Sequence, residues 1–248
     1  MIIRKSPEEL EKLRRAGRIT ARAREAVVAA VRPGVTTAQL DAIAEEVMRS
    51  EGAVPSFKGY RGFPASICAS INQELVHGIP GPRALREGDL FSVDVGAIWE
   101  GFHGDSAVTV YVGDSPPGDL EKLMRVTEES LEAGIGRALA GGRLSDISHA
   151  VEQVVEGAGF SVVREYVGHG IGRALHEDPQ VPNYGTPGRG PELRPGLALA
   201  IEPMVNAGGW ETRQLDDGWT VVTADGSLCA HFEHTVAITE DGPEVLTR

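Results

Sequence analysis

The stretch Leu90-Phe-Ser-Val-Asp-Val-Gly-Ala-Ile-Trp-Glu-Gly-Phe-His-Gly-Asp-Ser-Ala-Val-Thr-Val-Tyr-Val112 has the pattern of a β-hairpin. Both flanks alternate with period two, and the middle is turn-like. If the strands fold about Trp99–Glu100, Asp94 lies opposite Asp105, with Cβ atoms about 5 Å apart. Two facing anions are destabilising unless a positive charge lies between them, so the hairpin predicts a bound cation, most simply a metal ion.

The two faces of this hairpin differ in character. One face is apolar and carries Phe91, Val93, Val95, Val108 and Val110. The other face sets the two carboxylates among small residues, namely Ser92, Asp94, Gly96, Asp105 and Ala107. We therefore expect the first face to pack on the core and the second to hold a site.

Composition narrows the class of protein. The chain is 41% hydrophobic and 24% charged, as in ordinary globular proteins, and no apolar run approaches the roughly 20 residues of a membrane span. The N-terminal Met-Ile-Ile-Arg-Lys-Ser has no secretory pattern, and Cys68 and Cys229 give no disulfide framework. The formal charge of −12 argues against nucleic acid as the main partner. We expect a cytoplasmic protein that binds neither DNA nor a membrane.

The order of elements indicates one domain with an internal repeat. Capping boxes at Ser6 and Thr36 predict helices to about Val31 and to near Gly52. Helices are predicted again over 119–140 and 146–156, followed by strand-like residues 161–167. We expect a single domain over 1–248 with related halves at roughly 1–113 and 114–248, although two unrelated helical hairpins would look alike. The predicted class is α+β, an antiparallel sheet with helices covering one face.

The second half repeats the carboxylate pattern. In Leu197–Pro203, Glu202 shares a face with two alanines, and in Cys229–Ile238, Glu233 shares a face with Thr235, although His234 interrupts the apolar face. His169 lies in the glycine-rich loop 168–172, where a ligand can approach closely. Four carboxylates and one imidazole on small-residue faces predict a metal site rich in oxygen ligands, which favours Mn, Fe(II) or Co without excluding Zn.

Competing motifs are weak or absent. The sequence has no His-Glu-x-x-His, P-loop or Gly-x-Ser-x-Gly pattern, and loop 168–172 lacks the spacing of a dinucleotide fingerprint. A thiol pair of Cys68 with His77 is less favoured than a buried, inert cysteine. We interpret His103, His149 and His231 as solvated or structural.

Several motifs together resemble a known family. They are Ile71-Asn-Gln-Glu-Leu-Val-His-Gly-Ile-Pro80, Asp94-Val-Gly96, Gly101-Phe-His-Gly-Asp105, Gly168-His-Gly-Ile-Gly172, Ile201-Glu-Pro-Met-Val-Asn206 and Asp217-Gly-Trp219. The chain resembles, over nearly its whole length, the type I methionine aminopeptidases. Their pita-bread metallopeptidase fold is shared with prolidases and aminopeptidase P.

The resemblance implies a dinuclear aminopeptidase that removes the initiator methionine of nascent proteins and prefers a small second residue. Two divalent ions (Co, Mn, Fe(II) or Zn) would activate a water. The implied ligands are Asp94, Asp105, His169, Glu202 and Glu233, with Asp105 and Glu233 bridging. The implied catalytic residues are Glu202 as general base, with His77 and His176 contacting substrate.

The resemblance also implies two further sites. The methionine pocket would consist of Phe57, Tyr60, Phe63, Cys68 and Trp219, next to Leu175, where bacterial members mostly carry Phe. A sodium or potassium ion would lie by Asn72, Glu74 and Cys229.

Further hypotheses concern the partners and the substrate of this protein. We expect a monomer, and the helical stripe Arg15, Arg18 and Arg22 could dock on a ribosome, although a solvated face is the default. The same fold could instead cleave X-Pro bonds. A binding protein without catalysis is disfavoured because such proteins usually lose metal ligands.

Overall fold

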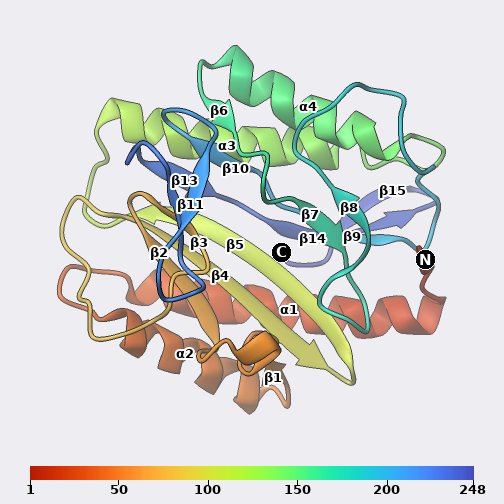
Figure 1. Ribbon diagram of the computed structural model, residues 1–248. Helices are drawn as coiled ribbons and strands as arrows, with labels where there is room; N and C mark the ends of the chain where they lie inside the picture. Colours follow the sequence, from red (N-terminus) through yellow and green to blue (C-terminus); the bar gives the residue numbers. More distant parts are fainter.

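The central hairpin is present in the computed structural model of the chain, which describes all residues 1–248 (Figure 1). Strands β4 (Leu90–Trp99) and β5 (Phe102–Tyr111) pair antiparallel, but the register differs from the predicted one. Asp94 lies opposite Ala107, and Asp105 lies opposite Gly96. The turn is therefore Glu100–Gly101, whose φ values of 46° and 79° suit the two-residue turn with two positive φ angles.

Four helices form two pairs. They are α1 (Pro7–Ala30), α2 (Thr37–Ser50), α3 (Gly118–Ile135) and α4 (Leu144–Gly157). Both capping boxes in the first pair are present, Ser6 with Glu9 and Thr36 with Gln39. Helix α3 ends at Ile135, before the predicted end at Ala140. Beyond Ile135 the chain forms turns, and the Gly141 N–H then donates to the Leu193 carbonyl.

The remaining elements are short. They are β1 (Val54–Pro55), a 3₁₀ turn (Tyr60–Gly62), β2 (Ile67–Ile71), β3 (Glu74–Val76), β6 (Ser161–Val162), β7 (Gly168–Gly170), β8 (Glu177–Val181), β9 (Ala198–Ile201), β10 (Met204–Asn206), β11 (Thr212–Gln214), β12 (Val221–Thr223), β13 (Cys229–His231), β14 (His234–Thr239) and β15 (Gly242–Val245). Every strand pair is antiparallel. The strand orders are β1-β4-β2 with β5 beside β4, β15-β14-β9-β7-β8, β13-β10-β6 and β11-β12-β3.

Three predicted strands differ from the observed ones. The predicted strand 229–238 is divided into β13 and β14, and the chain after Leu197 is divided into β9 and β10. Of residues 161–167, only 161 and 162 form a strand. Glu202 and Glu233 therefore lie at breaks between two sheets. At Glu202 the chain passes from the five-stranded sheet to the sheet of β10 and β13, and at Glu233 it passes back. Pro203 suits such a break because it has no N–H to donate.

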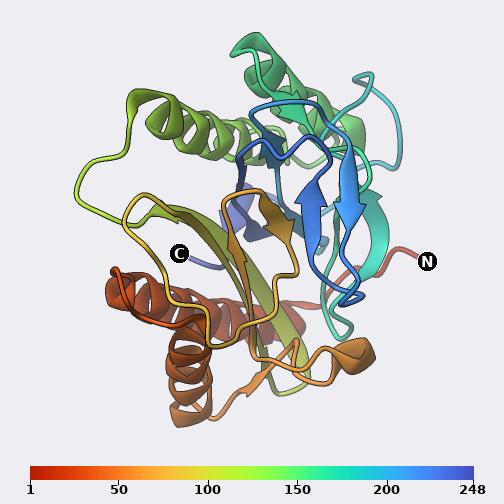
Figure 2. The same cartoon turned by 60° about the vertical axis from the view of Figure 1, so that its left-hand side comes forward.

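The helix pairs lie at opposite ends of the molecule, with the strands between them (Figures 1 and 2). Helix α1 packs on β4 and β5, so that Ile19, Ala23 and Val27 cover Phe91 and Val93. Helix α3 packs on β9, β10 and β13. The apolar hairpin face is thus buried under a helix, as predicted, and the face with the aspartates is turned toward the middle of the molecule. No helix has the length and hydropathy needed to span a membrane.

Candidate metal centre

One cavity of about 160 Å³ joins the five predicted metal ligands. Asp94 comes from β4, Asp105 from β5 and His169 from β7, while Glu202 and Glu233 come from the two strand breaks. The hairpin face that carries the two aspartates therefore meets β7 and the two strand breaks of the second half in one cavity.

The ligand atoms within this space are close together. One ligand atom each of Asp105, His169 and Glu233 lies within 4.8 Å of the others, and all three residues are buried. Nε2 of His169 lies 3.5 Å from Oε1 of Glu202 and 3.9 Å from Oδ2 of Asp105. This spacing allows one cation to contact several of these atoms.

Hydrogen bonds between the halves hold the two deepest carboxylates in place. The Thr235 hydroxyl accepts from the Asp105 N–H at 3.0 Å and donates to the Asp105 carbonyl at 2.8 Å. The Ser106 hydroxyl donates to the Glu233 carbonyl at 2.8 Å, and the Glu233 N–H donates to the Ala107 carbonyl at 3.0 Å. The backbones carrying Asp105 and Glu233 are thus fixed to each other across the seam between β5 and β14.

The electrostatics of the cavity favour a bound cation. Burial raises the pKa of Asp94 to about 7, and burial with neighbouring carboxylates raises the pKa values of Asp105, Glu202 and Glu233 well above their ordinary range. One oxygen each of Asp94 and Asp105 is buried without a hydrogen-bond partner. Such groups are costly unless paired, and divalent cations are natural partners for clustered carboxylates. The residues therefore fit a divalent metal site.

His169 is held in a form that can bind a metal. Its Nδ1 lies 2.9 Å from the Gly170 carbonyl, so a proton on Nδ1 leaves the Nε2 lone pair facing the carboxylates. Burial lowers the pKa of this imidazole to about 3, which keeps it neutral. The flanking glycines are needed for close packing, because a Cβ at Gly168 would lie 2.3 Å from the Ala200 carbonyl oxygen.

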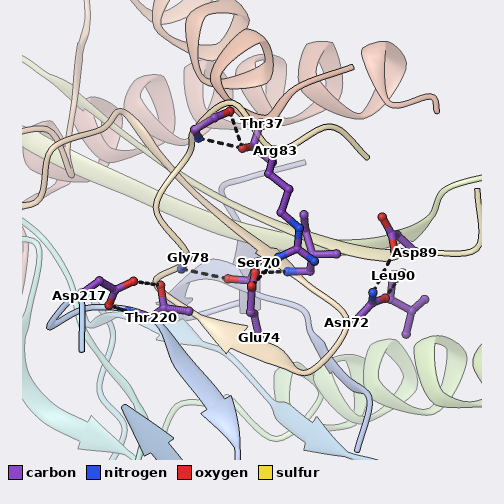
Figure 3. Close-up of polar contacts among 12 residues, drawn as sticks. Thr37, Ser70, Asn72, Glu74, Gly78, Arg83, Asp89, Leu90, Asp217 and Thr220 are labelled. Atoms are coloured by element: carbon purple, nitrogen blue, oxygen red, sulfur yellow. Dashed lines mark hydrogen bonds and ion pairs between the residues drawn. The ribbon is translucent and has the colours of Figure 1, made fainter. Parts of the chain in front are cut away.

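His77 lies at the edge of the cavity, directly after β3. Its φ of 61° is rare for a residue with a side chain, and such conformations persist where the surroundings impose them. The Gly78 N–H donates to the Ser70 hydroxyl at 3.1 Å (Figure 3), and the Ala69 N–H donates to the Gly78 carbonyl at 2.8 Å. Burial lowers the pKa of His77 to about 4, so the ring is neutral at pH 7.

His176 also lines the cavity, beside Tyr60. The Tyr60 hydroxyl lies 2.9 Å from Nδ1 of His176, and the two rings stack with centroids 5.4 Å apart. If the hydroxyl donates, the His176 proton is on Nε2. The loop carrying His176 is anchored by a buried ion pair of Lys5 with Glu177 at 2.6 Å.

The predicted methionine pocket forms the apolar part of the same cavity. Its lining includes Phe57, Tyr60, Phe63, Cys68, Trp219 and Leu175. Phe63 and Trp219 meet edge to face, with centroids 5.0 Å apart. Burial, followed by the charge of Asp94, raises the pKa of Cys68, so this thiol stays protonated and is no nucleophile.

The predicted monovalent-cation residues are held in internal bonds. The Asn72 side chain bonds Asp89 and Leu90, and Glu74 pairs with Arg83 at 2.6 Å (Figure 3). The Asn72 carbonyl accepts from the Cys229 N–H and thiol, both at 3.2 Å. Because these side chains are occupied, a cation there would depend on backbone carbonyls, and the site stays a prediction.

Two residues near the site were not predicted to be there from the sequence. Arg61 lines the cavity beside Tyr60, with its guanidinium 5.3 Å from that ring. His231, interpreted as solvated or structural, is buried, and its Nε2 lies 3.7 Å from Oε2 of Glu202. The strand pattern could not distinguish a buried imidazole from an exposed one.

Comparisons with known proteins agree with this geometry. Residues 11–240 match the model of metallopeptidase family M24. The chain belongs to metallopeptidase family M24. Methionine aminopeptidase 1 of Bacillus subtilis is an M24 relative with 58% identity over 248 residues, covering 100% of both chains. Methionine aminopeptidase 1 of Mycobacterium tuberculosis is 51% identical and covers 100% of this chain and 95% of its own.

Solved structures confirm the M24 fold. A methionine aminopeptidase from Thermotoga maritima superposes with a TM-score of 0.98 at 49% identity, covering 100% of both chains. Prolidase from Pyrococcus furiosus superposes with a TM-score of 0.82 over 99% of this chain and 65% of its own, and its 23% identity shows the fold alone. The predicted resemblance to type I methionine aminopeptidases and the predicted pita-bread α+β class are confirmed.

Proposed function

We propose that this metallo-aminopeptidase removes the N-terminal methionine from polypeptides by using two divalent ions held by the five residues of the metal centre. The observation that carries this proposal is that one cavity joins those residues to the apolar methionine pocket. The full-length relatives named methionine aminopeptidase support the substrate.

The chain's own residues suit hydrolysis of an amide. Bound divalent ions supply the positive charge that lowers the pKa of a water and polarises the scissile carbonyl. Glu202 would take the proton from the attacking water as general base and return it to the leaving amine nitrogen. Nε2 of His176, oriented through Tyr60, donates to the carbonyl oxygen as negative charge develops there. His77 would donate a hydrogen bond to the scissile nitrogen as that nitrogen becomes tetrahedral.

The ligand set supports two ions. Five protein ligands, four of them carboxylates, would suffice to hold two ions, and Asp105 and Glu233 could be shared between them. Asp94 would hold one ion, while His169 and Glu202 would hold the other. The oxygen-rich set suits Co, Mn or Fe(II), with Zn as a further candidate. Metal analysis of freshly purified protein identifies the ion, and also any sodium or potassium near Asn72.

Specificity follows from the walls of the cavity. The thioether of methionine suits aromatic neighbours and the Cys68 sulfur. His77 and Tyr166 meet edge to face, with ring centroids 5.9 Å apart, and we infer that this pair borders the second-residue site and restricts it to small side chains. A comparison of Met-Ala-Ser with Ala-Pro as substrates tests the assignment, because a prolidase-like enzyme would prefer the second.

We also infer the setting in which the enzyme works. The catalytic domain spans 1–248, and its halves, roughly 1–113 and 114–248, each supply ligands. The enzyme acts in the cytoplasm as a monomer on nascent chains. Ribosome docking would use Arg15, Arg18 and Arg22, although Arg15 and Arg22 already pair with Glu51. Unchanged co-sedimentation with ribosomes after triple alanine substitution would remove it.

A further inference from the structure

His231 is a buried imidazole that the proposed mechanism does not use. Its side chain is 3% exposed, and its Nε2 has no hydrogen-bond partner. The backbone of His231 is fixed, since its N–H donates to the Thr109 hydroxyl at 2.8 Å and its carbonyl accepts from that hydroxyl at 2.9 Å. A buried nitrogen without a partner is rare in folded proteins and calls for an explanation.

The one carboxylate within 4.0 Å of this nitrogen belongs to the metal centre. Nε2 of His231 lies 3.7 Å from Oε2 of Glu202, while the other oxygen, Oε1, lies 3.5 Å from Nε2 of His169. The Glu202 carboxylate is therefore set between two imidazoles, one on each oxygen. His169 directs its Nε2 into the ligand cluster, so it cannot also serve as the permanent donor to Glu202.

The surroundings argue against two simpler roles for His231. It is absent from the cavity lining, so a metal ion in the cavity meets Glu202 first. An ordinary core histidine would satisfy Nε2 on a nearby carbonyl or hydroxyl, and Nε2 of His231 forms no such hydrogen bond. The Glu202 carboxylate, 3.7 Å away, is the ionic acceptor beside this nitrogen.

We propose that His231 is a positioning residue whose Nε2–H donates to Oε2 of Glu202 and thereby keeps Oε1 directed at the metal centre. A closure of a few tenths of an ångström brings the pair within hydrogen-bond range. Donors behind a metal-ligating carboxylate fix its orientation, and their loss weakens metal binding or activity. The inference rests on the proposed role of Glu202.

The test uses the full-length chain with matched substitutions. His231→Gln places an amide N–H at about the reach of Nε2, whereas His231→Leu removes the donor and His231→Asn stops short of Glu202. The Kd of Mn²⁺ for the metal-free protein is measured by calorimetry, and kcat and KM for Met-Ala-Ser are measured in the reconstituted enzyme. Unfolding temperatures of the metal-free variants report on folding separately.

We expect His231→Leu and His231→Asn to weaken Mn²⁺ binding and to lower kcat, each by about 10- to 100-fold, with KM nearly unchanged. His231→Gln should stay within about threefold of the wild type in both quantities. If the His231→Leu variant does not fold, the His231→Asn variant must still show weaker Mn²⁺ binding and a lower kcat. Wild-type Mn²⁺ affinity in the Asn variant, or equal losses in Gln and Asn, would overturn the proposal.

Glu202→Gln separates this inference from the assignment beneath it. If Glu202→Gln binds Mn²⁺ and turns over as the wild type does, the proposed role of Glu202 is wrong. If Glu202→Gln is impaired while His231→Asn is not, the role of Glu202 stands and that of His231 is wrong.

Discussion

Asp94 and Asp105 lie diagonally across the β4–β5 hairpin, each opposite a small residue, Ala107 and Gly96 respectively. This offset keeps both carboxylates on one face while leaving them farther apart than a directly opposed pair. The space between them opens toward Glu233 and His169 from the other half of the chain. The hairpin thus supplies half of a metal centre, and the second half of the chain completes it.

Removing one carboxylate from the hairpin should remove the metal while sparing the fold. We expect Asp94→Asn to lower kcat/KM for Met-Ala-Ser by more than about 100-fold under limiting metal, because an amide is a poor ligand for a divalent ion. The metal-free variant should unfold at or above the wild-type temperature, since one member of a repelling cluster is lost. Asp114→Asn, at an exposed position beyond β5, is the matched control. A near wild-type rate in Asp94→Asn would refute the site assignment.

The stability of the metal-free protein should fall as the pH rises above 7. Asp94, Asp105, Glu202 and Glu233 have raised pKa values in the folded state, so the folded chain binds more protons than the unfolded chain there. Each such carboxyl group lowers the free energy of unfolding by up to about 1.4 kcal/mol per pH unit. Bound metal displaces those protons and should abolish the slope.

The window from pH 7 to 8 isolates this effect. Buried histidines have pKa values lowered to about 3 or 4 and give the opposite slope, but only below about 6.5, where the unfolded chain still binds their protons. Raised pKa values at Cys68 and Cys229 add a slope of the same sign only above about 8. Thermal unfolding with and without Mn²⁺ measures the slope, and a rise in metal-free stability across this window contradicts the account.

His77 should contribute to turnover rather than to metal binding. We expect His77→Asn to lower kcat by about 100-fold with an unchanged Kd for Mn²⁺, because a donor to the reacting amide is lost. Asn is the better probe because it tolerates the positive φ at this position, whereas Ala adds backbone strain. Calorimetry and steady-state kinetics on the same sample check this. Loss of metal in His77→Asn would place His77 among the ligands.

The Tyr60 hydroxyl should act through His176. Tyr60→Phe keeps the ring that packs in the methionine pocket but removes the hydroxyl that lies 2.9 Å from Nδ1 of His176. We expect kcat to fall about tenfold with KM for Met-Ala-Ser unchanged, because the proton on Nε2 of His176 is no longer fixed. Tyr111→Phe, at the far end of β5, is the control. A change in KM alone would assign Tyr60 to binding only.

Much of this architecture could be predicted from alternation and spacing. The hairpin, both capping boxes and the burial of Phe91 and Val93 under α1 follow from local pattern. The pairing register of the two strands could not be predicted from alternation, because shifting the turn by one residue leaves every side chain on the same face. Gly101 was the residue that indicated the correct turn, since a type I′ two-residue turn needs positive φ at both central positions.

Some features of the site could not be predicted from the sequence, because they depend on contacts between distant segments. Glu202 and Glu233 lie at strand breaks, where alternation no longer defines a face. The reciprocal bonds of Thr235 with Asp105 join residues 130 positions apart. His231 gained a candidate role only when Glu202 was found beside its buried Nε2.

The most direct test is the rate of Met-Ala-Ser hydrolysis by the metal-free chain as Mn²⁺ or Co²⁺ is titrated in. The account predicts no cleavage without metal, recovery of activity as divalent ions bind, saturation at no more than two ions per chain, and little activity toward Ala-Pro. Undiminished cleavage by the metal-free protein, or equal rates after Asp105→Asn substitution, would contradict it.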